Sequence, residues 1–323
     1  MRLSDLGEIK TIEFIQKIVK RVQKEVNISI GDDACVLKDG TIVTTDAYIE
    51  DIHFSLDYFS LYEIGQRVVC GTLSDIAAMA GKPLAIFVSA LLPPNLEKRS
   101  FKELYSGMQS ITREFSCEIA GGDIVAYPKI GMILTAIGKT KDAKLRSTAK
   151  PGDYLYVTGY CGLSETGRLA LKNKLSRKDF TNSITRHTCP IPRINEANQL
   201  KRYINALIDT SDGLSTDAFH LAQESNVKIQ IFTDSLPVHP ETKKLVNRLK
   251  LSEESLTLNG GEDYELLFTS QKDNLPSKIL DIPIKKIGVC KQGRGLISVK
   301  DGKEYQLQPK GYDHFLTKQK IKY

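Results

Sequence analysis

Residues 61–80 read LYEIGQRVVCGTLSDIAAMA. Apolar or weakly polar side chains recur along one helical face, at Ile64, Val68, Thr72, Ile76 and Met79. This spacing predicts an amphipathic helix. Asp75 falls beside the apolar stripe, toward the C-terminal half of the helix, where a carboxylate is costly without a cation. A buried hydrogen bond to backbone amides is the alternative explanation for this aspartate.

Further elements are predicted around this helix in the first half of the chain. A β-rich segment at 41–45 runs into Asp46, which predicts that this carboxylate ends a strand. Strands are expected at 84–92 and 130–138, and helices at 12–22 and 101–115. Together they predict a first α/β unit.

The turn sequence Lys150-Pro151-Gly152-Asp153 is the predicted domain boundary, which gives domains 1–149 and 150–323. Beyond it we expect strands at 154–158, 206–208, 227–232, 264–269 and 284–289, and helices after Gly162, at 214–224 and at 241–249. Strands and helices alternate irregularly. The sequence therefore predicts mixed α/β sandwiches rather than a doubly wound sheet.

Composition narrows the class of protein. The 323 residues carry 45 Lys and Arg against 39 Asp and Glu, a net charge of +6 that is spread along the chain apart from a basic tail at 318–322. This mild excess predicts a solvated surface rather than nucleic-acid binding. The six cysteines form no Cys-x-x-Cys pair, and the apolar stretch 84–92 is too short to span a bilayer. We expect a cytoplasmic protein without a signal peptide, disulfide framework or membrane partner.

Six short acidic motifs concentrate negative charge in this net basic chain. They are Gly31-Asp32-Asp33, Thr44-Thr45-Asp46, Ser74-Asp75, Gly121-Gly122-Asp123, Asp209-Thr210-Ser211-Asp212-Gly213 and Gly260-Gly261-Glu262-Asp263. Carboxylates with neighbouring hydroxyls suit Mg²⁺, which shares oxygen ligands with substrate phosphates. Taken singly, the first motif could be an ordinary turn and the second a helix cap. The paired glycines at 121–122 fit either a tight turn or a close approach of phosphate to the backbone.

Familiar phosphate-binding loops are missing from the sequence, both the Gly-x-x-x-x-Gly-Lys-Ser/Thr loop and the glycine loop of protein kinases. Carboxylate-held Mg²⁺ would suffice for phosphoryl transfer, because that reaction depends mainly on position and charge. His53 could contact substrate or be an ordinary histidine. Arg146 could clamp a phosphate or be solvated. Tyr312 could stack on a ring or pack in the core.

The ordered set of motifs resembles the thiamine-monophosphate kinase family, in the superfamily that also contains aminoimidazole ribonucleotide synthetase and selenophosphate synthetase. The resemblance runs from Gly7-Glu8 to residues 311–315, and 74–79, 211–214 and 260–266 are its most specific segments. It implies a two-domain fold like that of aminoimidazole ribonucleotide synthetase, and a homodimer formed through the N-terminal domain. It also implies direct transfer of the γ-phosphoryl group of ATP to thiamine monophosphate.

The resemblance also implies roles for individual residues. The ligands of several Mg²⁺ ions would be Asp33, Thr44, Thr45, Asp46, Asp75, Asp123, Asp209 and Asp212. ATP would contact Gly122, Asp123, Arg146 and Ser211. Thiamine monophosphate would contact His53, Glu262 and Tyr312, with Tyr312 facing its ring system.

Some positions depart from the family pattern. Asp51 stands where Gly is common, Thr72 where Asn is common, and Ile124-Val125 where two threonines are common. None of these changes removes a proposed metal ligand. The alternatives are another ATP-using member of the superfamily and a nucleotide-binding homologue without turnover. A selenophosphate synthetase would need a reactive Cys in an N-terminal glycine-rich segment, and this chain has none.

Overall fold

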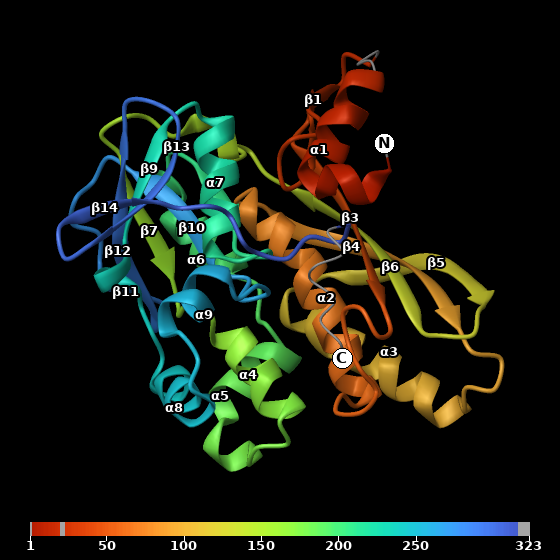
Figure 1. The fold of residues 1–323 in the computed structure, drawn as a ribbon. Helices are drawn as coiled ribbons and strands as arrows, with labels where there is room; N and C mark the ends of the chain where they lie inside the picture. The colour runs from red at the N-terminus through yellow and green to blue at the C-terminus, as the bar shows by residue number, and fades with distance from the viewer. Residues whose placement is uncertain (1, 20–22, 316–323) are drawn as a thin grey trace.

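The computed structural model describes residues 2–19 and 23–315, which form two mixed β-sheets flanked by helices (Figure 1). The first sheet has the strand order β1-β2-β3-β6-β4-β5. Its strands are β1 (Val26–Ile28), β2 (Cys35–Leu37), β3 (Thr41–Ile49), β4 (Lys82–Leu92), β5 (Glu118–Ala126) and β6 (Gly131–Lys139). Only β4 and β5 run parallel within the described sheet.

Helices α2 (Leu61–Ala78) and α3 (Lys98–Glu114) pack closely together beside this sheet. Helix α2 begins at a capping box, in which Ser60 Oγ accepts from the Glu63 amide at 3.2 Å and Glu63 Oε2 accepts from the Ser60 amide at 2.8 Å. Gly65 and Gly107 allow the two helices to approach, because a Cβ at either position would lie 2.0 Å from a carbonyl oxygen of the other helix.

The second sheet, in the C-terminal half, has the order β14-β13-β9-β12-β7-β10-β8, with β11 paired to β12. Its strands are β7 (Tyr154–Thr158), β8 (Leu207–Asp209), β9 (Lys228–Phe232), β10 (Leu266–Ser270), β11 (Lys278–Ile279), β12 (Ile282–Lys291), β13 (Gly295–Lys300) and β14 (Lys303–Gln306). The accompanying helices are α4 (Leu163–Lys172), α5 (Thr181–Thr188), α6 (Ile194–Leu200), α7 (Leu214–Glu224), α8 (Pro240–Leu249) and α9 (Glu253–Asn259).

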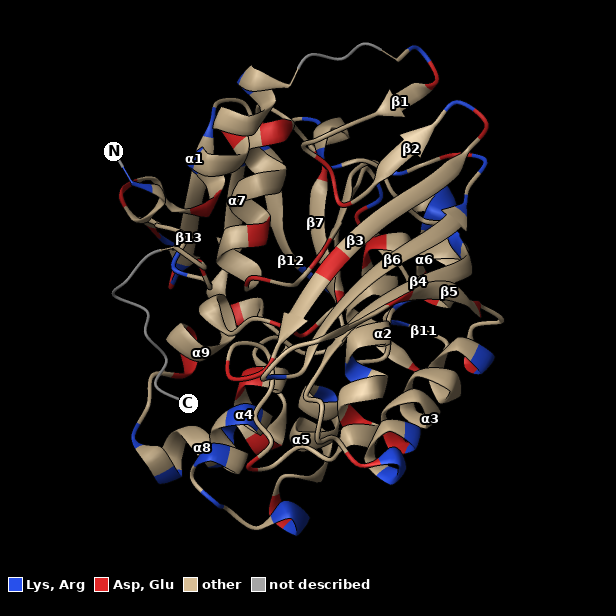
Figure 2. Ribbon diagram, turned by 90° about the vertical axis from the view of Figure 1, so that its right-hand side faces the viewer, with Lys and Arg blue, Asp and Glu red and all other residues tan. Residues whose placement is uncertain are grey.

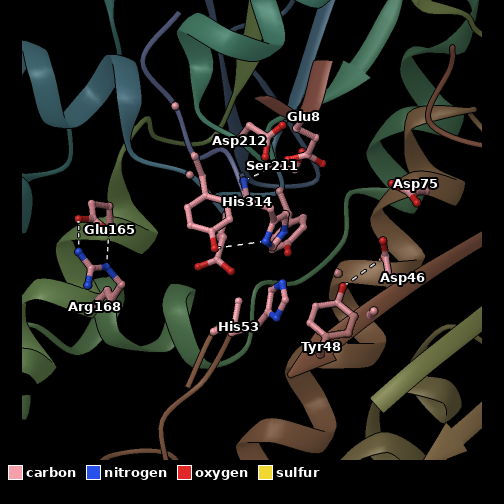
Figure 3. A pocket seen from close by; sticks show the side chains of 18 of the residues that line it. Glu8, Asp46, Tyr48, His53, Asp75, Glu165, Arg168, Ser211, Asp212 and His314 are labelled. Atoms are coloured by element: carbon pink, nitrogen blue, oxygen red, sulfur yellow. Dashed lines mark hydrogen bonds and ion pairs between the residues drawn. The ribbon is translucent and has the colours of Figure 1, made fainter. Parts of the chain in front are cut away.

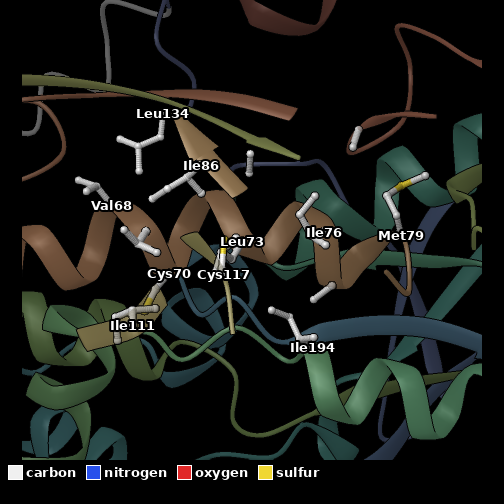
Figure 4. Close-up of a cluster of buried hydrophobic side chains, with 14 of the residues drawn as sticks. Val68, Cys70, Leu73, Ile76, Met79, Ile86, Ile111, Cys117, Leu134 and Ile194 are labelled. Atoms are coloured by element: carbon white, nitrogen blue, oxygen red, sulfur yellow. The ribbon is translucent and has the colours of Figure 1, made fainter. Parts of the chain in front are cut away.

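Helix α2 lies at the centre of the molecule and is buried on nearly all sides. Val68 faces Ile86 and Leu134 of the first sheet, whereas Ile194 of α6 approaches the helix from the C-terminal half (Figure 4). The sequence predicted a helix with one apolar face. The helix is instead buried on nearly all sides, because α6 and other elements of the C-terminal half cover the side of α2 that faces away from the first sheet.

Most predicted elements are confirmed, including α7, which spans Leu214–Glu224. The prediction that Asp46 ends a strand is wrong, because β3 pairs with β6 from Thr41 through Ile49 and places Asp46 inside the strand. The motif Gly121-Gly122-Asp123 is part of β5 rather than a tight turn. The predicted helix at 12–22 belongs to α1 (Leu3–Ile18), and its last three residues lie outside the described residues, as does the basic tail at 318–322.

The N-terminal helix α1 and the C-terminal segment meet although they are at opposite ends of the chain. The Glu8 amide donates to Asp313 Oδ2 at 3.0 Å. Figure 2 shows Lys and Arg distributed over several elements, among them α3 and α8, rather than on one face. Within residues 2–19 and 23–315, no helix is long and apolar enough to cross a membrane.

Candidate functional site

Three aspartates from separate elements converge between the two halves of the molecule. Asp33 precedes β2, Asp75 is on α2 and Asp209 ends β8. One carboxylate oxygen from each lies within 4.8 Å of the other two. Arg146 binds Asp33 with two hydrogen bonds, of 3.0 and 2.6 Å, and Ser74 Oγ donates to Asp209 Oδ2 at 2.5 Å.

The close approach of these carboxylates changes their protonation. Burial and the neighbouring charges of Asp46 and Asp209 raise the pKa of Asp75 well above its usual value. Burial and the charge of Asp33 raise the pKa of Asp209 to about 8. Thr44 Oγ1 donates a hydrogen bond to Asp75, which compensates for only part of this cost. The cluster therefore has oxygen ligands whose charged forms the protein itself stabilises poorly, and a divalent cation would stabilise them.

A cavity of about 680 Å³ adjoins the cluster and is lined by residues of both halves (Figure 3). Asp75, Asp46 and Thr45 line it from the first half, and Ser211 and Asp212 from the second. Burial, followed by the charge of Glu8, raises the pKa of Asp212 to about 7. The cavity is large enough for a small-molecule substrate.

Aromatic rings cross the other end of the cavity. The ring centroids of Tyr48 and His53 lie 5.6 Å apart, those of His53 and His314 5.2 Å, and those of His314 and Tyr312 4.7 Å. His53 Nδ1 accepts from the Ile49 amide at 3.0 Å. Burial lowers the pKa of His53 to about 4, so this imidazole is neutral at physiological pH. This end therefore offers flat, uncharged surfaces to a ligand.

Acidic side chains at this aromatic end are paired with arginines. Glu262 forms an ion pair with Arg67 of α2, and Glu165 binds Arg168 through two hydrogen bonds of 2.6 Å. Arg67 itself is fully buried. The paired acids thus have fixed positions on the cavity wall.

The structure brings together most of the site residues predicted from the sequence. Those that line the cavity are Thr45, Asp46, His53, Asp75, Ser211, Asp212, Glu262 and Tyr312. Those next to it, in or touching the aspartate cluster, are Asp33, Thr44, Arg146 and Asp209.

Gly122 and Asp123 lie apart from these residues, on the edge strand β5. The strand register runs from Asp46 through β6 and β4 to Gly122. Three strand spacings separate the two positions, which corresponds to about 14 Å. Within one chain, these two residues are therefore away from the cavity wall.

Sequence reasoning missed several residues at the cavity, including Glu8, Lys310, His314 and Arg168. His314 is two residues from Tyr312, and its pairing with His53 depends on the fold. A signal was present for Arg67, because an arginine inside the strongly apolar segment 64–79 requires a buried partner.

Comparison with known proteins places the chain among described families. Residues 31–140 match the family model for the N-terminal domain of AIR synthase related proteins. The chain is 34% identical to the thiamine-monophosphate kinase of Aquifex aeolicus, over 98% of this chain and 100% of that protein. It is 33% identical to the enzyme of the same name from Bacillus subtilis, over 94% and 98% of the two chains.

Solved structures also match this chain over most of its length. The structure described as AaThiL complexed with AMPPCP and TMP superposes with a TM-score of 0.88 at 33% identity, and the match covers 97% of this chain and 99% of that chain. The hydrogenase maturation protein HypE in complex with ATP superposes with a TM-score of 0.70 at 18% identity, covering 97% of this chain and 95% of that chain. The second match shows a shared fold.

Proposed function

The chain belongs to the thiamine-monophosphate kinase family and is an ATP-dependent kinase of thiamine monophosphate, and we propose that it transfers the γ-phosphoryl group directly and in line in a site with several Mg²⁺ ions. The products are thiamine diphosphate and ADP. The observation that carries the proposed mechanism is the convergence of Asp33, Asp75 and Asp209 within 4.8 Å, beside a cavity of about 680 Å³.

The proposed Mg²⁺ ligands are the cluster itself and the oxygen-bearing residues around it. They are Asp33, Thr44, Thr45, Asp46, Asp75, Asp209 and Asp212. Asp123 is proposed as a further ligand, although it lies away from the cluster on the edge strand β5. The donor set fits Mg²⁺, because it consists of carboxylates and hydroxyls and its buried carboxylates have raised pKa values. When bound, Mg²⁺ would neutralise charge on the phosphates of ATP.

We propose different contacts for the two substrates. Arg146 and Ser211, with Gly122 and Asp123, are proposed to contact ATP. His53, Glu262 and Tyr312 are proposed to contact thiamine monophosphate, and all three line the end of the cavity with the aromatic rings.

Direct transfer is favoured because the acceptor phosphate can itself act as the nucleophile. The attacking oxygen belongs to the phosphate of thiamine monophosphate and is largely deprotonated at neutral pH. A strong general base is therefore not required.

An assay of ADP release tests the reaction and its acceptor. Thiamine monophosphate should support release, whereas thiamine and unrelated monophosphates should not. Equal release with thiamine would contradict the proposed acceptor. A chiral γ-phosphate should invert its configuration, and net retention or a trapped phosphoenzyme would contradict direct transfer.

We also propose that the two domains are 1–149 and 150–323, that the first pairs in a homodimer and that the protein is cytoplasmic.

The proposed homodimer has an exposed apolar surface available to it in the first domain. Phe87 and Val125 lie on the sheet face opposite α2 and are 39% and 50% exposed. Apolar exposure of this kind is typical of an interface. Val125→Lys should yield a monomer by light scattering, whereas Leu280→Lys, at an equally exposed site in the second half, should not.

A further inference from the structure

Arg67 is a fully buried charged residue at the centre of α2, where it contacts three other parts of the chain. Its Nη2 pairs with Glu262 Oε1, and its Nη1 donates to the carbonyl oxygen of His187 at the end of α5. Its guanidinium carbon lies 5.6 Å from the ring centroid of Phe59. Arginine is rarely buried without a specific partner, so these contacts require an explanation.

The Glu262 side chain depends on this contact for its position. Its backbone has a left-handed φ of 64°, and its amide donates to the Ser211 carbonyl at 2.8 Å. A non-glycine residue adopts this φ at a cost in free energy, which the surrounding contacts must offset. The ion pair uses Oε1, and the side chain, which is 29% exposed, lines the cavity. The carboxylate can therefore be paired with Arg67 and still face a ligand in the cavity.

Helix α2 also carries Asp75 of the aspartate cluster. Arg67 and Asp75 are eight residues apart, which corresponds to about 12 Å along a helix axis. The same rigid element thus fixes a carboxylate proposed for metal binding in its last turn and, near its middle, a cation that holds Glu262. A substrate with a phosphate at one end and a positively charged ring system farther along matches this arrangement.

We propose that Arg67 is a positioning residue for thiamine monophosphate, which orients the Glu262 carboxylate toward the positively charged ring system of that substrate. This inference rests on the proposed role of Glu262 in substrate binding. It adds that α2 sets the spacing between two ends of the cavity. These are the proposed metal-binding end, where Asp75 lies, and the proposed ring-binding end, where His53, Glu262 and Tyr312 lie. Arg67 acts through Glu262 and does not itself line the cavity.

Kinetics of single and double variants test this inference. Arg67→Met should raise the KM for thiamine monophosphate roughly tenfold to a hundredfold, the scale on which a small misplacement of a binding group acts. The KM for ATP should remain unchanged. Arg67→Lys keeps the charge but loses the fork that reaches both Glu262 and His187, so it should restore part of the lost affinity. The double variant Arg67→Met/Glu262→Gln should be no worse than Glu262→Gln alone, because the two residues act as one unit.

Arg193→Lys is the matched control for a purely structural ion pair. Arg193 is buried and binds Glu265 with hydrogen bonds of 2.7 and 2.6 Å, and neither residue lines the cavity. This variant should lower the melting temperature and leave both KM values unchanged. If Arg67→Met and Arg67→Lys, like Arg193→Lys, lower the melting temperature and leave both KM values unchanged, the positioning role is refuted. Additive effects of Arg67→Met and Glu262→Gln would refute it as well.

The Glu262→Gln variant separates this inference from the proposed function. A raised KM for thiamine monophosphate in Glu262→Gln with normal KM values in both Arg67 variants would overturn the role of Arg67 alone. An unchanged KM in Glu262→Gln would remove the substrate role of Glu262, and the inference would fail with it.

Discussion

The two ends of the cavity differ in what balances their negative charge. At the ring-binding end, the protein supplies a guanidinium to Glu262 and another to Glu165. At the proposed metal-binding end, Arg146 pairs with Asp33, whereas Asp75 and Asp209 accept hydrogen bonds from the hydroxyls of Thr44 and Ser74 and lie close to other carboxylates. Hydroxyls do not neutralise charge. We therefore expect the ring-binding end to be prearranged and the proposed metal-binding end to require a bound cation.

The largest effect is expected for Asp75→Asn at the metal-binding end. Turnover should fall roughly a hundredfold or more, the scale for losing one electrostatic group in an active site. The melting temperature without Mg²⁺ should stay the same or rise, because Asn removes a carboxyl group that the fold must either keep charged at a cost or protonate. The rise in melting temperature that Mg²⁺ gives the wild type should be lost.

Asp153→Asn is the control for a buried aspartate that the protein itself satisfies. Asp153 accepts from the Lys150 amide at 2.9 Å and from Thr269 Oγ1 at 3.0 Å. Its replacement should lower the melting temperature and leave turnover per folded enzyme unchanged. Near-normal turnover of Asp75→Asn at saturating Mg²⁺ would remove the distinction between the two ends.

A smaller effect is expected for Tyr312 at the ring-binding end. Tyr312→Ala should raise the KM for thiamine monophosphate several-fold, since a cation–π contact with the thiazolium contributes about 0.5 to 2 kcal/mol. The KM for ATP should change little. Tyr312→Phe should be mild, although it also removes the 3.3 Å contact between Tyr312 Oη and His314 Nδ1. An equal rise in the KM for thiamine monophosphate and for ATP would show that Tyr312 contributes to packing rather than to a substrate contact.

The smallest effect on activity is expected for His187, whose carbonyl accepts from Arg67 and whose ring affects the pH dependence of stability. Burial, with the charges of Arg67 and Arg168, holds the pKa of His187 well below its usual value. The unfolded chain takes up this proton near pH 6.5, whereas the folded protein does not. The free energy of unfolding of the wild type should therefore exceed that of His187→Asn by its largest amount above pH 6.5. This difference should shrink on acidification by at most about 1.4 kcal/mol per pH unit.

Ser164→Ala provides the comparison for this pH effect. Ser164 Oγ lies 3.2 Å from His187 Nδ1, so the variant removes a hydrogen-bond partner and keeps the imidazole. Denaturant unfolding between pH 5 and 8 should give a stability gap to wild type that is nearly constant for this variant. A constant gap for His187→Asn as well would show that His187 titrates normally in the folded state.

The sequence predicted the residues of the aspartate cluster. Asp33, Asp75 and Asp209 stand in short motifs whose residue types reveal their chemistry, and the structure brings them together. The spacing of apolar residues also predicted helix α7, because the residues on its apolar face are the ones that are buried in the structure. Local signals and tertiary structure agree in these regions.

The remaining features depend on pairing between distant segments. Asp46 lies inside β3 because β6 pairs along the whole strand, which no local pattern at 41–45 indicates. The glycines at 121–122 are in β5 because β4 pairs with them, although glycine is a poor strand former. The contacts of Arg67 with Glu262 and His187 join residues separated by more than a hundred positions and required the fold.

The most direct test of this account is a crystal structure of the protein with Mn²⁺, a non-hydrolysable ATP analogue and thiamine monophosphate, with the metals located by anomalous scattering. Mn²⁺ prefers the same oxygen ligands as Mg²⁺. The account predicts anomalous peaks in contact with Asp33, Asp75 and Asp209, and the thiamine rings beside His53, Tyr312 and Glu262. Metal peaks away from the three aspartates, or rings bound outside the aromatic end, would contradict it.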